Sequence, residues 1–159
     1  MRTLSRLFLW FIYLFLWGII IYSYQITGFY WMIVVLNGEL SRIWLAVLVA
    51  GLRFALQSAF FLGILRLILK TLPSLEIYLK STIPLALAGL MSSILRLFHN
   101  DWVPFRIIVE QVTLMLGLIL TMILLSKWIS AKRKSYILST LSCTLAGLLV
   151  FLILIPMPL

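Results

Sequence analysis

The apolar run from Ile43 to Leu69 constrains this chain more than any other stretch, because it can cross a bilayer and carries Arg53 near its middle. A crossing helix needs about 20 predominantly apolar residues. A charged side chain at that depth is costly, so such residues usually face the interior of a helical bundle and not the lipid. The stretch therefore predicts a helix inside a membrane-embedded bundle.

The composition excludes a water-soluble fold. Of the 159 residues, 64% are hydrophobic and 11% are charged, whereas soluble domains have about 45–50% apolar and about 25% charged residues. The 13 Lys and Arg against 4 Asp and Glu give a net charge of +9. In so apolar a chain this surplus is typical of a cytoplasmic membrane surface that faces anionic lipid. Nucleic acid is a poor partner, because no extramembrane domain is expected.

Five crossings follow when the chain is divided at about 20 residues per helix, within a single transmembrane domain, 1–159. The expected spans are 7–24, 43–66, 83–98, 106–128 and 136–155. Residues 29–36 are too short to cross, so we expect an interfacial or re-entrant segment there, with a sixth crossing as the alternative. Residues 71–82 are expected to form a cytoplasmic amphipathic segment. The first span lacks a polar stripe, and we expect it to face lipid or a partner protein.

The basic residues beside these spans predict a cytoplasmic N-terminus, because Lys and Arg concentrate in cytoplasmic loops. Only Arg42, Arg96 and Arg106 then lie near outer ends of spans. Tyr22 and Tyr24 are expected to be interfacial anchors. The bacterial cytoplasmic (inner) membrane is the expected location. The residues on the cytoplasmic side are Arg2, Arg6, Arg66, Lys70, Lys80, Lys127, Lys132, Arg133 and Lys134.

Small residues at helical spacing predict two packing faces, because such residues let another helix approach closely. One face recurs every four residues in the second span, and the other lies in the third. We expect both faces at helix–helix contacts. Their members are Gly51, Ala55, Ala59 and Gly63 in the second span, and Gly89 and Ser93 in the third.

Polar side chains in the same spans predict a cluster in the outer half of the bundle. Two interpretations stay open. Intramembrane charges often pair with one another and fix helix register. Guanidinium groups also bind phosphate or carboxylate, which favours a cavity for an anionic or amphipathic small molecule or lipid. The expected ligand-binding members are Arg53, Gln57, Arg96, Arg106 and Glu110, with Glu39, Arg42, His99 and Asp101 around the mouth.

Motifs for catalysis and for metal or cofactor binding are weak. His99 and Asp101 are proton-handling residue types, but they adjoin in one loop, and one histidine does not make a multi-histidine metal site. Cys143 is the single cysteine and lies in an apolar run, where a thiol is a poor nucleophile. We therefore expect no catalytic residue, no metal and no cofactor.

These features predict a non-enzymatic integral-membrane subunit of a larger complex, either a transporter or a cell-envelope assembly. Five crossings with little chain outside the bilayer leave no space for an energy-coupling or catalytic domain. An autonomous small transporter or ligand-binding protein, acting as a homo-oligomer through an outward-facing cavity, is the first alternative. A membrane-embedded lipid-headgroup enzyme acting through His99 and Asp101 is the second.

Overall fold

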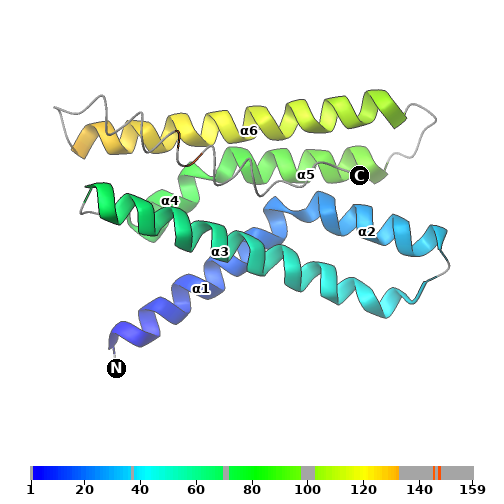
Figure 1. Cartoon of the computed structure of the whole chain (residues 1–159), viewed down its shortest axis with the longest axis horizontal. Coiled ribbons are helices and arrows are strands. Elements are labelled where there is room, and N and C mark those ends of the chain that lie inside the picture. The colour runs from blue at the N-terminus through cyan, green and yellow to red at the C-terminus, as the bar shows by residue number, and fades with distance from the viewer. Residues whose placement is uncertain are drawn as a thin grey trace.

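Helices make up most of the chain that the structure, a computed structural model, describes, namely residues 2–36, 38–69, 72–97 and 103–132, with Leu145 and Gly147. This bears out the predicted all-α fold for those ranges (Figure 1). The expected fifth span, 136–155, lies outside the described residues apart from Leu145 and Gly147. The elements are α1 (Arg2–Ile21), α2 (Ser23–Val35), the 3-10 turn η1 (Leu40–Arg42), α3 (Ile43–Leu69), α4 (Leu75–Ser81), α5 (Ile83–Leu97) and α6 (Val103–Lys132).

Two stretches of the described chain are long and apolar enough to cross a membrane, Leu40–Leu67 and Phe105–Trp128. Two further pairs qualify only as bent units, in which α1 meets α2 at 58° and α4 meets α5 at 45°. Each bend is the geometry of a broken span or of a re-entrant loop. The described residues therefore contain two to four candidate crossings, and the predicted count of five or six remains a proposal.

The break between α1 and α2 falls at Tyr22, inside the stretch that was expected to be one straight span, 7–24. The Tyr22 N–H donates to the Gly18 carbonyl at 2.9 Å, and the Gln25 N–H donates to the Tyr22 carbonyl at 2.9 Å. Hydrogen bonding therefore continues on both sides of the bend. Residues 29–36, expected to be an interfacial or re-entrant segment, begin within α2 and extend one residue past its end.

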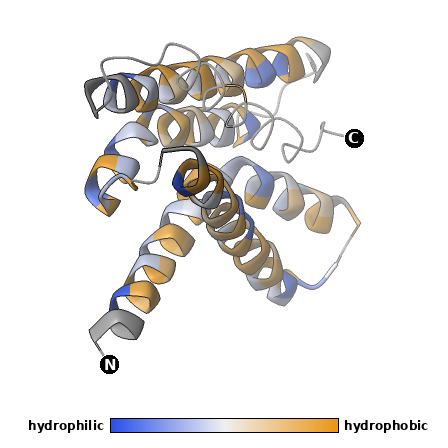
Figure 2. Ribbon diagram, turned by 60° about the vertical axis from the view of Figure 1, so that its left-hand side comes forward, coloured by the Kyte–Doolittle hydropathy of each residue, from blue (hydrophilic) through white to orange (hydrophobic). Residues whose placement is uncertain are grey.

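The bent α1–α2 unit lies between α3 and α5 (Figures 1 and 2). Both of its helices pack on α3 and on α5, and α5 packs in turn on α6. The expectation that the first span faces lipid or a partner is wrong for its second half, where Leu14, Gly18 and Ile21 are buried. A polar stripe is not required for burial here, because helices in membranes associate by van der Waals packing as well as by polar contacts.

Glycines allow α1 and α3 to approach each other closely. A Cβ added to Gly18 would lie 2.6 Å from Phe54 Cβ of α3, and a Cβ on Gly51 would lie 2.6 Å from the Phe15 ring of α1. Contacts this short do not occur between real Cβ atoms and their neighbours, so the α1–α3 distance depends on residues without side chains.

The predicted small-residue faces have different environments along their length. Gly51 and Ala55 are buried, whereas Ala59 and Gly63 are exposed. A Cβ on Gly63 would meet no atom within 4 Å. In α5, Gly89 faces the Ile21 carbonyl oxygen so closely that a Cβ would overlap it. The α5 face therefore packs on the end of α1.

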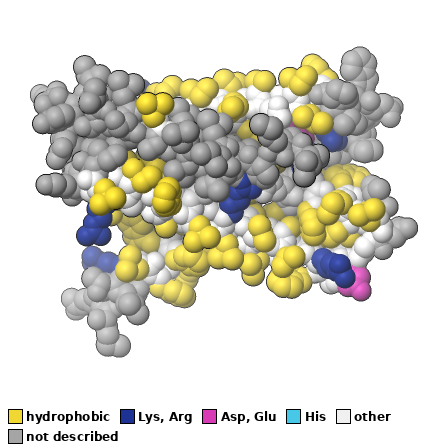
Figure 3. All heavy atoms as spheres, in the orientation of Figure 1, with side chains coloured by type: hydrophobic (Ala, Val, Ile, Leu, Met, Phe, Trp, Pro, Cys, Tyr) yellow, Lys and Arg dark blue, Asp and Glu magenta, His cyan; other side chains and the backbone are white. Residues whose placement is uncertain are grey.

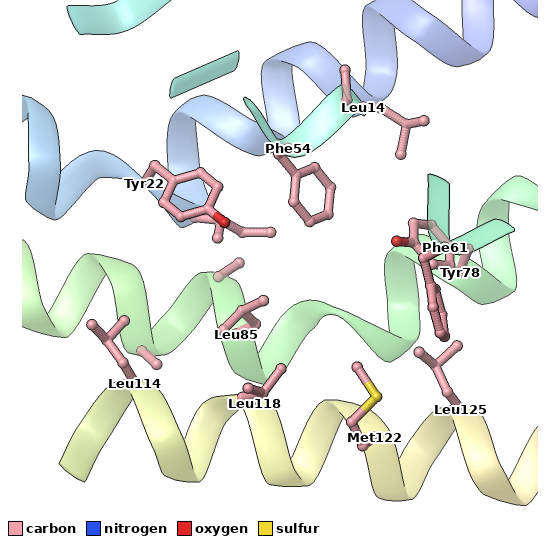
Figure 4. Close-up of a cluster of buried hydrophobic side chains, with 14 of the residues drawn as sticks. Leu14, Tyr22, Phe54, Phe61, Tyr78, Leu85, Leu114, Leu118, Met122 and Leu125 are labelled. Carbon is pink, nitrogen blue, oxygen red and sulfur yellow. The ribbon is translucent and has the colours of Figure 1, made fainter. Parts of the chain in front are cut away.

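The hydrophobic core runs between these layers (Figure 4). Phe54 and Phe61 of α3 are at most 1% exposed, as is Tyr78 of α4. Figure 4 shows Leu85 of α5 directed at Leu118 of α6. Large apolar side chains also lie on the outside of the bundle, where Figure 3 shows them on the described parts of one face, as expected for a surface in contact with lipid.

Candidate functional site

A buried carboxylate joins α5 to α6 at the end of the bundle where α5 ends and α6 begins. Arg96 Nε lies 2.9 Å from Glu110 Oε2, and Arg106 Nε lies 3.7 Å from Glu110 Oε1. The side chains of Glu110, Arg96 and Arg106 are 3%, 17% and 26% exposed. The structure therefore brings together three of the five predicted ligand-binding residues.

Helix α2 holds Arg96 from the opposite side. The guanidinium carbon of Arg96 lies 5.4 Å from the centre of the Tyr24 ring, and the guanidinium lies against Gly28, where a Cβ would overlap it. Tyr24 and Gly28 are four residues apart and so share one face of a helix. One helical face thus supplies both an aromatic surface and the space that the charged group occupies. Cation–π contacts contribute about 0.5–2 kcal/mol.

Arg53 joins this group through α2. Its Nη1 atom donates to Gln25 Oε1 at 3.3 Å, and Gln25 Nε2 donates to the Tyr24 hydroxyl at 3.3 Å. The guanidinium carbon of Arg53 also lies 4.7 Å from the centre of the Tyr22 ring. The expected meeting of Arg53 with Arg96 is therefore indirect and passes through two residues of α2.

Gln57 lies one helical turn beyond Arg53 and is 2% exposed. Its Oε1 atom accepts a hydrogen bond from the Tyr22 hydroxyl. We refer to the connected set of charged and polar side chains as the polar network. Its members are Tyr22, Tyr24, Gln25, Arg53, Gln57, Arg96, Arg106 and Glu110.

The polar network has more donors than acceptors. It contains three guanidinium groups and one carboxylate, which leaves two positive charges in excess among the described members. Arg106 Nε and Gln57 Nε2 are buried donors without a hydrogen-bond partner, and Glu110 Oε1 is a buried acceptor without one. A buried polar atom left without a partner costs about 1–3 kcal/mol. An added acceptor group would therefore satisfy donors that the described residues leave unmatched.

The predicted mouth residues are only partly described. Arg42 Nε lies 3.9 Å from Glu39 Oε2, and both side chains are more than 70% exposed. His99 and Asp101 lie outside the described residues. In the described ranges, no group of three or more His, Cys, Asp and Glu is placed to hold a metal ion.

The contribution of α2 was missed in the sequence. Tyr22 and Tyr24, expected to be interfacial anchors, are buried at 2% and 4% exposure, so that expectation is wrong. Ser23 was also missed, and its Oγ atom lies 2.7 Å from Ser93 Oγ of α5. The sequence signal for a buried polar segment was the run from Ser23 to Gly28, which contains several polar residues and separates two apolar stretches.

No protein-family model matches this chain, and no curated protein or solved structure matches it. The functional interpretation therefore depends on the geometry of the polar network.

Proposed function

We propose that this chain is a non-enzymatic integral membrane protein that binds the anionic headgroup of an amphipathic molecule at the polar network. The observation that carries the proposal is the shortage of acceptors, with buried donors at Arg106 Nε and Gln57 Nε2 and an excess of guanidinium groups. A phosphate, sulfonate or carboxylate supplies both acceptor oxygens and negative charge. Arginine binds such groups with paired hydrogen bonds.

The ligand approaches from the outer side of a bacterial cytoplasmic membrane in this proposal. Exposed basic residues support the orientation: Arg6, Arg66, Lys80 and Lys127 lie near the end of the bundle where α1 begins and α3 ends (Figure 1). Lys and Arg mark the cytoplasmic side. The pair of Arg96 and Glu110 belongs to the opposite end.

An amphipathic ligand fits the surroundings of the network better than a small hydrophilic anion does. Exposed apolar side chains surround the same end of the bundle, so a ligand tail can lie against them while the headgroup contacts arginine. The apolar side chains include Tyr30 and Met32 of α2, Ile94 and Leu97 of α5, and Phe105 and Ile108 of α6.

A binding titration tests the proposal. Decyl sulfonate serves as the probe, because its headgroup stays anionic across the usable pH range. Isothermal titration of the protein in zwitterionic nanodiscs is expected to show saturable binding. Arg96→Gln is expected to weaken that binding at least tenfold, about 1.4 kcal/mol.

Two further variants make the titration specific. Arg42→Gln is the matched control, because Arg42 is exposed and pairs with Glu39; its affinity is expected to equal that of the wild type. Arg96→Lys keeps the positive charge but lacks the planar guanidinium group, and its affinity for decyl sulfonate is expected to lie between those of Arg96→Gln and Arg42→Gln. Equal affinity in wild type and Arg96→Gln would contradict the proposal.

A second candidate function is a structural subunit of a larger membrane complex. The first half of α1 favours it, because the consecutive residues Leu7, Phe8 and Leu9 are 69%, 64% and 51% exposed and extend away from the other helices (Figure 2). An all-round apolar helix needs lipid or another chain around it. Extraction in mild detergent followed by mass analysis tests this function: a co-purifying chain supports it, and a lone stable monomer argues against it.

A further inference from the structure

We propose that anion binding at the polar network is coupled to the uptake of one proton by Glu110. This inference rests on the proposed function, because it requires an anion beside the arginines. Among the described members of the network, Glu110 supplies the single carboxylate. Its two oxygens face different cations, with Oε2 2.9 Å from Arg96 Nε and Oε1 3.7 Å from Arg106 Nε.

An incoming anion competes with Glu110 for the same guanidinium groups. Arg96 is held between the Tyr24 ring and the space left by Gly28, so it has little freedom to move toward a ligand. Arg106 Nε has no hydrogen-bond partner and lies 3.7 Å from Glu110 Oε1, which makes it the expected first contact. An anion there lies beside Glu110 Oε1, and a neighbouring negative charge favours protonation of a carboxylate.

The atom that would take the proton is well defined. Glu110 Oε1 is buried and has no hydrogen-bond partner, and the side chain is 3% exposed. Solvent therefore screens the repulsion between the two negative groups only weakly. Protonation turns Oε1 from an acceptor into an O–H donor. The neutral Glu110 then donates a hydrogen bond to the anion, and the anion replaces the carboxylate charge beside Arg106.

Among the residues that the structure describes, the other groups that face Glu110 keep their charge state. They are Arg96 on α5, Arg106 on its own helix and Tyr24 on α2, while Arg53 on α3 connects through Gln25. Arginine is not deprotonated in proteins, and neutral tyrosine does not ionise near neutral pH. Binding one monoanion together with one proton leaves the net charge of the network unchanged.

The closing experiment measures affinity and proton uptake together. Decyl sulfonate is titrated into wild-type protein in zwitterionic nanodiscs between pH 5 and pH 8. Because the probe does not titrate, any pH dependence belongs to the protein. Coupling predicts that the dissociation constant rises with pH, with a limiting slope of about tenfold per pH unit for one linked proton. A pH indicator in weak buffer is expected to report uptake approaching one proton per bound anion.

Variants separate this inference from the proposed function. Glu110→Gln is expected to bind the probe with pH-independent affinity and without proton uptake, whereas Glu76→Gln, which changes an exposed carboxylate paired with Lys80, keeps the wild-type pH dependence. If wild-type binding depends on Arg96 but is pH-independent and takes up no protons, the coupling is wrong and the proposed function stands. Absence of Arg96-dependent binding at every pH contradicts both. If Glu110→Gln fails to fold, His99→Gln decides: wild-type proton uptake in this variant supports Glu110, and loss of the uptake contradicts the coupling.

Discussion

Arg96 Nε lies 2.9 Å from Glu110 Oε2, and this buried ion pair joins two helices at positions fourteen residues apart in the sequence. Gly28 of a third helix leaves the space that the Arg96 guanidinium occupies. Three helices therefore meet at one charged contact inside an apolar bundle. A buried charge of this kind is stable only while its partners remain in place.

Removal of the Glu110 carboxylate alone is expected to destabilise the protein more than removal of the ion pair. Glu110→Leu leaves Arg96 buried without a counter-charge, and the free energy of unfolding is expected to fall by about 3 kcal/mol. Arg96→Met combined with Glu110→Leu is expected to recover most of that loss, since Arg106 is the more exposed of the two arginines. Unfolding titrations in mixed micelles measure both variants. A double variant no more stable than the single one would argue against this account.

Replacing glycine by alanine is expected to have opposite effects on stability at the contact between α5 and the end of α1 and at an open position on α3. Gly89→Ala places a methyl group against the Ile21 carbonyl oxygen, and overpacking is expected to lower stability by about 2 kcal/mol. Gly63→Ala meets open space and is expected to raise stability by about 0.5–1 kcal/mol, because alanine favours the helix. Thermal melts in detergent compare the two. Similar melting temperatures for both variants would show that this contact is misplaced.

The hydroxyl of Tyr22 is expected to contribute to stability through Gln57. Tyr22→Phe removes the donor to a buried amide oxygen, with an expected loss of about 1–2 kcal/mol. The phenyl ring still lies beneath Arg53, so the cation–π contact is kept. Tyr13→Phe is the matched control, because Tyr13 is 52% exposed, and it is expected to leave the unfolding free energy unchanged. Equal losses from both substitutions would count against the Tyr22–Gln57 contact.

The orientation of the bundle predicts which positions react from outside an intact cell. In a Cys143→Ser background, Ser41→Cys in η1 is expected to react with a membrane-impermeant maleimide. Leu72→Cys, an exposed position before α4, is expected to react only after permeabilisation. The reverse pattern would place the basic end of the bundle outside and would contradict the cytoplasmic N-terminus.

Much of the helical fold is predictable from hydrophobic length. The long apolar runs around Arg53 and Glu110 predicted helices that the structure places at Ile43–Leu69 and Val103–Lys132. The bend at Tyr22 was not predictable, because neither proline nor glycine occupies the break itself and the helical hydrogen bonds continue through it. Its central position is a result of packing against both α3 and α5, and hydrophobic length carries no information about such packing.

The part of the candidate site formed by Arg96 and Glu110 was predictable from charge and helical spacing. Arg96 and Glu110 pair because one short connection joins two helices whose polar faces carry them, and both faces are visible in the sequence. The burial of Tyr24 was missed because a buried aromatic residue and an interfacial anchor look alike in sequence. The link from Arg53 through Gln25 depends on the position of α2, which only the tertiary structure supplies.

The charge preference of the polar network is the most direct measurement to make. Three amphiphiles with the same decyl tail, an anionic sulfonate, a cationic trimethylammonium and a neutral maltoside, are titrated into the protein in zwitterionic nanodiscs. An excess of guanidinium groups over carboxylates predicts that the sulfonate binds at least tenfold more tightly than the other two, and that Arg96→Gln reduces this preference. Binding of the trimethylammonium amphiphile as tight as that of the sulfonate, or tighter, would contradict an acceptor-deficient network of arginines.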